Sequence, residues 1–274
     1  MSIKQRLYDN IPYLFETGPR GSDELSKLGK VSLLITPDNL PTVANRADEI
    51  FQAITFDSLT FTCKNGQDFE FFDYLELLAP YIKKLTVQEI CGRIDFAQFE
   101  KFRNLVSIYS LIPKPKNLRL CMFPLLRMAI LGIINKVDVL ENAESLECLK
   151  LMRNLQLENT GWLWLSTLPR LQRLELIQFV MDSLKGIPNC SNLSYLNIAY
   201  PRRLKTLDGI EALINLKTLE VEGARQLLDY SAVGKLQSLQ CLWIIESALP
   251  KSLSFLNELP KIKESKFNGN DLIT

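Results

Sequence analysis

The sequence predicts an α/β solenoid, in which short repeats stack side by side and each adds one strand to a parallel β-sheet on the concave face. The main observation is a pattern that returns after 23 residues. Residues 183–198 have the sequence SLKGIPNCSNLSYLNI, and residues 206–221 have TLDGIEALINLKTLEV. A third copy, YSAVGKLQSLQCLWI, occupies residues 230–244. A fixed period in this range indicates a repeat architecture, because each repeat buries its apolar face on its neighbours.

The framework positions of these copies form the motif L-x-x-L-x-x-L-x-L. Leu193 and Leu196, for example, recur as Leu216 and Leu219. This pattern resembles the leucine-rich repeat family, in particular its short bacterial, internalin-like members. The resemblance implies a leucine-rich repeat horseshoe and a function in non-catalytic protein binding.

The chain is expected to begin with a cap and to continue as one solenoid. Residues 1–24 are the predicted N-terminal cap, where Leu7, Ile11, Leu14 and Phe15 have helical spacing around Pro12. Residues 25–274 are the predicted solenoid, irregular over 25–135 and regular over 136–274. Longer N-terminal repeats leave room for helices, which we expect over 45–53 and from Phe71 to Ile82.

The strand register is open between residues 100 and 135. Residues 108–110 suit a strand, and Leu118 with Leu120 competes with them. Met128 and Ile130 are expected to point inward, with Ala129 outward. After residue 136 the last inward residues recur every 22 to 25 residues, at Leu151, Leu176, Ile198, Val221, Ile244 and Phe267.

The turns after the strands depart from the family pattern. Asn154 occupies the position where family members use an asparagine to bond the turn backbone. The equivalent positions Phe179, Pro201, Ala224 and Ser247 lack it, and Asn270 restores it. We expect other groups to satisfy these turns, and the loops there to be irregular, with less uniform curvature. Lys261, Lys263 and Lys266 would blunt an open edge at the last strand.

Composition excludes several classes of chemistry. The chain has no histidine, which removes Ser-His-Asp and Cys-His catalysis and His-ligated zinc. Its six cysteines are far apart and lack a C-x-x-C pair, so reduced thiols in the cytoplasm are expected. The net charge of +1 gives no general attraction to nucleic acid or to an anionic membrane. No apolar export signal or membrane-length run is visible, and no cofactor or metal is expected.

The candidate site is the concave face of the sheet. In an x-L-x-L-x strand the leucines enter the core and the x residues face outward. Basic side chains gather in the middle repeats and acidic ones towards the C-terminus, around Trp243. The partner-binding candidates are Arg127, Lys150, Arg173, Glu175, Tyr195, Asn197, Tyr200, Glu220, Glu222, Trp243, Ile245 and Glu264. The alternative is an ordinary solvated sheet, with Trp243 stacked on its neighbours.

A second aromatic candidate lies outside the strands. Trp162 and Trp164 belong to the crossing NTGWLWLSTLP, where packing against adjacent crossings is expected and an exposed binding patch is the alternative.

The function predicted from these features is non-catalytic protein binding. A small cytoplasmic bacterial chain of this kind is similar to an immunity protein that covers a toxin domain, and the acidic end would suit a basic toxin. A secreted effector, or an adaptor that binds a host or signalling protein, is the alternative. Catalysis is disfavoured. Nucleic-acid binding is also disfavoured, and its candidate residues would be Arg127, Lys150, Arg153 and Arg173. We expect no membrane association, and a monomer or weak dimer.

Overall fold

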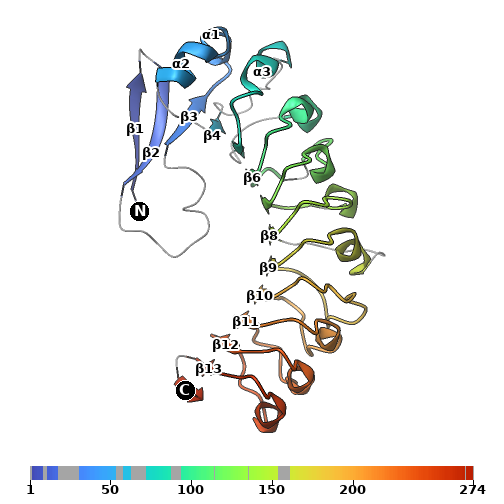
Figure 1. The fold of residues 1–274 in the computed structure, drawn as a ribbon. Helices are drawn as coiled ribbons and strands as arrows, with labels where there is room; N and C mark the ends of the chain where they lie inside the picture. Colours follow the sequence, from blue (N-terminus) through green and yellow to red (C-terminus); the bar gives the residue numbers. More distant parts are fainter. Residues whose placement is uncertain are drawn as a thin grey trace. The chain divides into compact units, whose positions relative to one another are not determined.

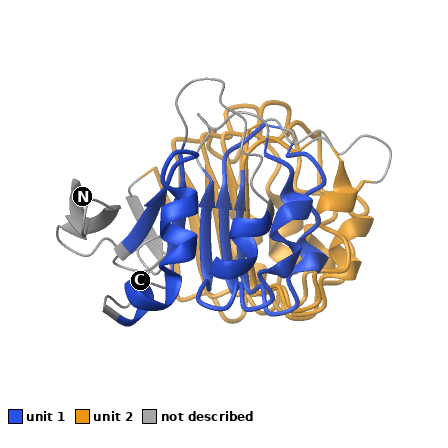
Figure 2. Cartoon of the chain, turned by 90° about the horizontal axis from the view of Figure 1, so that it is seen from above, with its two compact units in different colours: residues 1–131 blue, residues 132–274 orange. Residues whose placement is uncertain are grey.

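The computed structural model describes residues 2–8, 11–17, 31–53, 58–62, 72–87, 94–113, 115–134, 136–153, 161–268 and 270–273. The chain divides into two compact units, Met1–Leu131 (unit 1) and Gly132–Thr274 (unit 2), coloured separately in Figure 2. Every helix within the described ranges is too short or too polar to cross a lipid bilayer.

Unit 1 consists of strands joined by helical crossings (Figure 1). Its strands are β1 (Ser2–Tyr8), β2 (Ile11–Thr17), β3 (Val31–Ile35), β4 (Ser58–Phe61), β5 (Lys84–Val87), β6 (Ser107–Ser110) and β7 (Met128–Leu131). Its helical segments are α1 (Leu40–Asn45), α2 (Ala47–Ala53), α3 (Phe72–Leu78), η2 (Phe96–Lys101) and η3 (Leu120–Met122), the last two being 3₁₀ turns. Strands β3 to β7 pair in parallel, and α2 and α3 confirm the two helices expected in the long repeats.

The N-terminal segment is a β-hairpin, so the helical prediction for Leu7 to Phe15 is wrong. β1 and β2 pair antiparallel, and β2 continues antiparallel onto β3. Pro12 lies outside the stretch of β2 that pairs with β3, where its missing N–H costs no bond to that strand. The apolar spacing misled because four apolar residues in a short segment fit either period. The boundary of the cap at residue 24 stays a prediction.

The predicted register of β7 is wrong by one residue. Ala129 pairs with the inward Ile108, and both are fully buried. Ile130 instead pairs with the partly exposed Tyr109. The run MAIL offers no apolar–polar alternation, so its sequence alone could not fix which side faces the core. Residues 108–110 do form the strand, whereas Leu118 and Leu120 are buried in the crossing that follows.

Unit 2 is the regular part of the chain. Its strands are β8 (Cys148–Met152), β9 (Arg173–Ile177), β10 (Tyr195–Ala199), β11 (Thr218–Glu222), β12 (Cys241–Ile245), β13 (Glu264–Phe267) and β14 (Asn270–Ile273). Its crossings contain the 3₁₀ turns η4 (Val137–Val139), η5 (Leu163–Thr167), η6 (Ile210–Ala212), η7 (Ser231–Lys235) and η8 (Ser254–Glu258). A repeat of 22 to 25 residues leaves no length for the α-helices that cover the longer repeats of unit 1.

Alternation along the strands of unit 2 confirms the predicted core. β8 to β13 pair in parallel without a register shift, so equivalent leucines lie in rows. Leu149, Leu174, Leu196, Leu219 and Leu242 form one row, each at most 1% exposed. Burial of one such side chain contributes about 1.5–3 kcal/mol to folding, so these rows hold the stack together.

The two crossing tryptophans are core residues, as the packing interpretation predicts. Trp162 and Trp164 are each 1% exposed, and the Trp162 ring meets Phe179 edge-on with centroids 6.3 Å apart. Leu163 between them is 67% exposed.

The irregular loops expected after the strands are a wrong prediction, because these turns begin with one shared backbone conformation. The first residue after each strand has positive φ: Arg153, Gln178, Tyr200, Gly223, Glu246 and Asn268. In this conformation the Tyr200 N–H donates to Glu222 O, and the Gly223 N–H donates to Ile245 O at 2.9 Å. The backbone ladder is thereby extended by one residue beyond β8, β9, β10 and β11. Asn154 lies outside the described residues.

Asparagines do bond turn backbones, at a different position. Asn104, Asn192 and Asn215 each precede the first leucine of a strand motif, and their Nδ2 groups donate to carbonyls of the preceding repeat at 2.7–3.3 Å. The expectation of an open edge at β13 is also wrong, because β14 pairs antiparallel with β13.

Candidate binding surface

The outward side chains of β8 to β13 form one surface, which we call the strand face of unit 2. They alternate with the buried leucines and are partly exposed on β8, β9, β11, β12 and β13. In unit 1, by contrast, β4 is buried on both faces, and outward Ser58 and Thr60 are 2% and 4% exposed. β5 of unit 1 alternates as the strands of unit 2 do, so what distinguishes unit 2 is the set of aromatic and charged side chains on its strands.

Most of the predicted site residues lie on this surface. Those on the strand face are Lys150, Arg173, Glu175, Tyr195, Asn197, Glu220, Glu222, Trp243, Ile245 and Glu264. Tyr200 is the residue directly after β10. Arg127 does not belong to the group, because it precedes β7 in unit 1.

The two cations at the basic end of the strand face share one carboxylate. Glu175 accepts from Lys150 Nζ at 2.8 Å and from Arg173 Nε at 2.7 Å. Burial raises the pKa of the Glu175 carboxyl, but the two cations outweigh it and hold that pKa below its ordinary value. Arg173 also covers the Tyr195 ring, with its guanidinium carbon 3.6 Å from the centroid. The cation, the carboxylate and the ring fix one another in place.

The acidic end is built from tyrosine–glutamate pairs. The Tyr195 hydroxyl donates to Glu220, and the Tyr200 hydroxyl donates to Glu222. Burial, followed by the bond to Glu220, raises the pKa of Tyr195. The bond to Glu222 raises the pKa of Tyr200 to about 12, so both phenols keep their protons at neutral pH.

Tyr200 is held although it is 42% exposed. A Cβ on Gly223 would lie 2.3 Å from Cδ1 of Tyr200, so the ring rests directly on the glycine. Gly223 was not among the predicted site residues. The sequence held a signal for it, because the equivalent positions in neighbouring repeats are Gln178 and Glu246. Both adopt the same backbone conformation with a side chain, so the conformation alone does not require a glycine.

Trp243 lies at the centre of the acidic end. It pairs with Glu220 on one side and with Lys266 on the other. Lys266 Nζ binds Glu264 at 2.7 Å. That bond, and more weakly the indole N–H of Trp243, lower the pKa of Glu264, although the indole does not complete a hydrogen bond. Ile245 adds a partly exposed apolar side chain beside Glu222.

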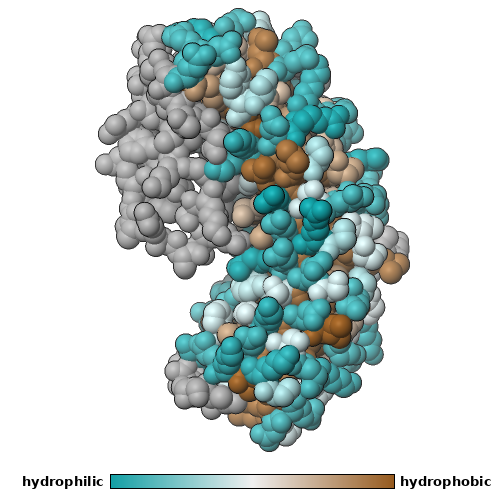
Figure 3. Space-filling view, in the orientation of Figure 1, coloured by the Kyte–Doolittle hydropathy of each residue, from teal (hydrophilic) through white to brown (hydrophobic). Residues whose placement is uncertain are grey.

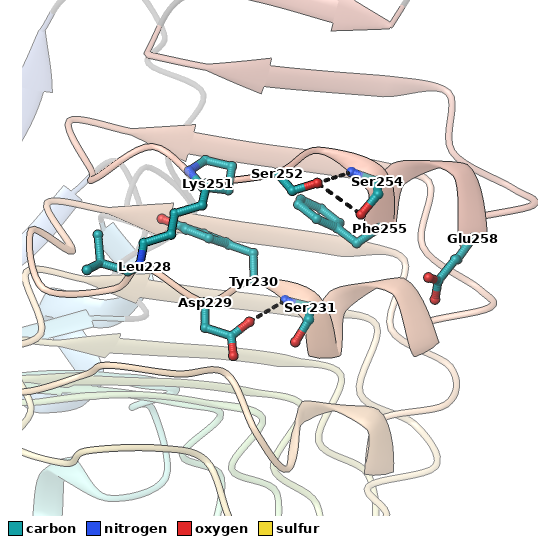
Figure 4. A pocket seen from close by; sticks show the side chains of 10 residues that line it. Leu228, Asp229, Tyr230, Ser231, Lys251, Ser252, Ser254, Phe255 and Glu258 are labelled. Carbon is teal, nitrogen blue, oxygen red and sulfur yellow. Dashed lines mark hydrogen bonds between the residues drawn. The ribbon is translucent and has the colours of Figure 1, made fainter.

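A hollow of about 340 Å³ lies on another part of unit 2, between the turns that follow β11 and β12 (Figure 4). Tyr230 and Phe255 stack beneath it, with centroids 6.3 Å apart. Its polar groups are bound locally: the Ser231 N–H donates to Asp229 at 2.9 Å, and Ser252 bonds Ser254. They do not converge on a common point, so the hollow offers no evident chemistry.

The face of unit 2 seen in Figure 3 is mainly hydrophilic, with separate apolar patches between the polar side chains. Within the described ranges no three Cys, Asp or Glu side chains come together in a way that could hold a metal ion.

Comparison with solved structures identifies the fold. A crystal structure of internalin InlF from Listeria monocytogenes has TM-score 0.56 and 16% identity, over 79% of this chain and 69% of that one. A leucine-rich repeat protein from Leptospira interrogans gives 0.60 and 14%, over 85% and 58%. Internalin C2 from Listeria monocytogenes gives 0.51 and 18%, over 85% and 96%. No family profile and no curated protein sequence matches the chain. The predicted leucine-rich repeat fold is confirmed.

Proposed function

We propose, from the premise of a leucine-rich repeat fold, that this chain is a non-catalytic protein-binding module that recognises its partner through the strand face of unit 2. The observation that carries the proposal is the preorganised group of aromatic and charged side chains on that face. Tyr200 rests on Gly223 and Arg173 lies over the Tyr195 ring, so binding costs little further ordering of these side chains. Aromatic and arginine anchors surrounded by charge are typical of binding hot spots.

The charge distribution favours a basic partner. Glu220, Glu222 and Glu246 lie together at the acidic end, and complementary charge speeds encounter and sets orientation. We infer more specifically an immunity protein of the bacterial cytoplasm that covers a basic toxin domain. An effector or adaptor that binds a host or signalling protein is the competing role.

The decisive experiment is partner capture followed by measured affinity. Tagged protein is used to capture partners from the organism that encodes it, and the captured proteins are identified by mass spectrometry. Affinity for the purified partner is then measured by calorimetry. Trp243→Ala should weaken binding by about 2 kcal/mol, roughly 30-fold, as expected for a hot-spot tryptophan.

Leu163→Ala is the matched control, because Leu163 is exposed on a crossing of the same unit. If Leu163→Ala weakens binding and Trp243→Ala does not, the binding surface is the crossing side and the strand-face proposal is wrong. Stoichiometric inhibition of the partner's toxic activity supports the immunity role. A captured partner that is not inhibited supports the adaptor or effector role.

A further inference from the structure

The acidic end of the strand face has carboxylates that form no close ion pair with a described lysine or arginine, although Arg225 contributes positive charge near Tyr200. The cations of that face are engaged elsewhere: Lys150 and Arg173 bind Glu175, and Lys266 binds Glu264. Among the described residues, no lysine or arginine nitrogen lies within 4 Å of three carboxylates, those of Glu220, Glu222 and Glu246. Negative charge therefore predominates on the Glu220 side of Trp243, while Lys266 lies on its other side and is bound to Glu264.

Glu220 keeps capacity to accept further hydrogen bonds. Among the described residues its hydrogen-bond donor is the Tyr195 hydroxyl, whereas an ionised carboxylate offers about four acceptor positions. Tyr195 is itself fixed beneath the Arg173 guanidinium. The carboxylate of Glu220 is therefore held in position by a rigid neighbour while most of its acceptor positions remain available.

Trp243 supplies an aromatic group at the adjacent position. Glu220 and Trp243 are direct partners in the parallel register of β11 and β12, so both side chains project from the same face of the sheet. Paired strands lie about 4.8 Å apart, which places an indole and a carboxylate side by side. Trp243 is partly exposed, unlike Trp162 and Trp164.

The same chemistry already occurs on this face with the chain's own arginine. Arg173 lies over the Tyr195 ring at 3.6 Å and donates to Glu175 at 2.7 Å. A planar guanidinium can stack on a ring and donate to a carboxylate at the same time, which an ammonium group does less well. Glu220 and Trp243 present the ring and the carboxylate without such an arginine from the described chain.

We propose that Glu220 and Trp243 form a receptor for an arginine side chain of the protein partner. The guanidinium stacks on the Trp243 indole and donates to Glu220, and Glu222 and Glu246 raise the local concentration of cations. This inference rests on the proposed binding function and specifies the chemistry of the partner at one point of contact.

The test uses the indole N–H signals of the intact ¹⁵N-labelled protein. Trp243 should shift on titration with N-acetyl-argininamide, while the buried Trp162 and Trp164 serve as internal controls of folding. N-acetyl-citrullinamide, a neutral analogue of the same shape, should bind at least about fivefold more weakly, since it lacks the charge that Glu220 recognises. N-acetyl-lysinamide should also bind more weakly, because its ammonium group cannot stack as a plane.

Glu220→Gln should reduce the response to N-acetyl-argininamide at least about fivefold, because it removes the ionic acceptor. Glu144→Gln, which changes an exposed carboxylate outside the strand face, should leave it unaltered. An equal response to citrulline or lysine, or an unchanged response in Glu220→Gln, overturns the receptor. If the receptor fails while the unmodified protein still captures its partner, the binding function stands and only the arginine assignment is wrong.

Discussion

At the scale of single residues, close contacts within the chain fix the positions of side chains on the strand face. Tyr200 is an exposed aromatic whose ring rests on Gly223 and whose hydroxyl is bound by Glu222. Backbone conformation alone does not require the glycine, because Gln178 and Glu246 adopt positive φ at equivalent positions. The ring above Gly223 is what excludes a side chain there.

Gly223→Ala tests this contact. We expect the substitution to cost roughly 2–3 kcal/mol of unfolding free energy, of which about 1–2 kcal/mol is left-handed backbone strain. The remainder comes from displacing the Tyr200 ring, so in a Tyr200→Ala background the cost should fall by about 1 kcal/mol. Urea unfolding of both single variants and the double variant measures this coupling. Equal costs in the two backgrounds would show that the ring contributes nothing.

The ionisation of Tyr200 gives a second residue-scale prediction. Its pKa is raised to about 12 by the bond to Glu222, above the ordinary tyrosine value of about 10. The protonated phenol therefore stabilises the folded chain fully below about pH 10, and this contribution is lost as the pH rises towards 12. Ultraviolet titration of phenolate in wild type and Tyr200→Phe should differ by one group with a midpoint near 12. A difference centred near 10 contradicts the hydrogen bond.

At the scale of elements, each repeat of unit 2 has the same strand but satisfies its turn differently. After β12 the solution is Ser247, whose hydroxyl accepts from the Ala224 N–H at 2.9 Å and donates to Ile245 O at 2.9 Å. The Asn268 side chain of the next repeat binds both backbone groups of Ser247. It accepts from the Ser247 N–H and donates to the Ser247 carbonyl, at 3.2 Å each. A side chain from one repeat thus closes the turn of another.

Ser247→Ala should destabilise the protein by about 1–3 kcal/mol, because it leaves a buried backbone N–H without its acceptor. Ser191→Ala is the matched control: Ser191 is an exposed serine of the same unit in the segment before β10, and the change should stay within about 0.5 kcal/mol. Denaturant unfolding of both variants provides the comparison. Similar effects of the two substitutions would mean that the Ser247 hydroxyl has no special structural role.

At the scale of the whole molecule, the net charge is only +1, but acidic and basic side chains are separated from each other on the surface. On the strand face of unit 2 the cations of β8 and β9 share one carboxylate, whereas β11 and the end of β12 carry three carboxylates that no described cation pairs. On the proposed function, this arrangement orients a basic partner without making the protein adhere to polyanions in general.

Glu222→Gln should therefore change how fast a basic partner binds more than how long it stays. We expect the association rate constant to fall roughly two- to fivefold at low ionic strength, and the difference to shrink as salt is added. The dissociation rate should change little. Stopped-flow measurements with Glu144→Gln as control test this, and a salt-independent loss through faster dissociation would contradict long-range steering.

The sequence by itself determined the repeat architecture, because a 23-residue period of leucines leaves few other ways to bury them. It also placed most of the candidate site, since alternation along an x-L-x-L-x strand fixes which side chains face outward. Where apolar and polar residues do not alternate clearly, at MAIL in β7 and in the N-terminal hairpin, the prediction from sequence was wrong. Only the tertiary structure decided that Tyr200 rests on Gly223, that Asn268 closes the turn at Ser247, and that Arg173 covers the Tyr195 ring. These contacts join residues more than 20 positions apart through side-chain packing, which a one-dimensional pattern of polar and apolar residues does not encode.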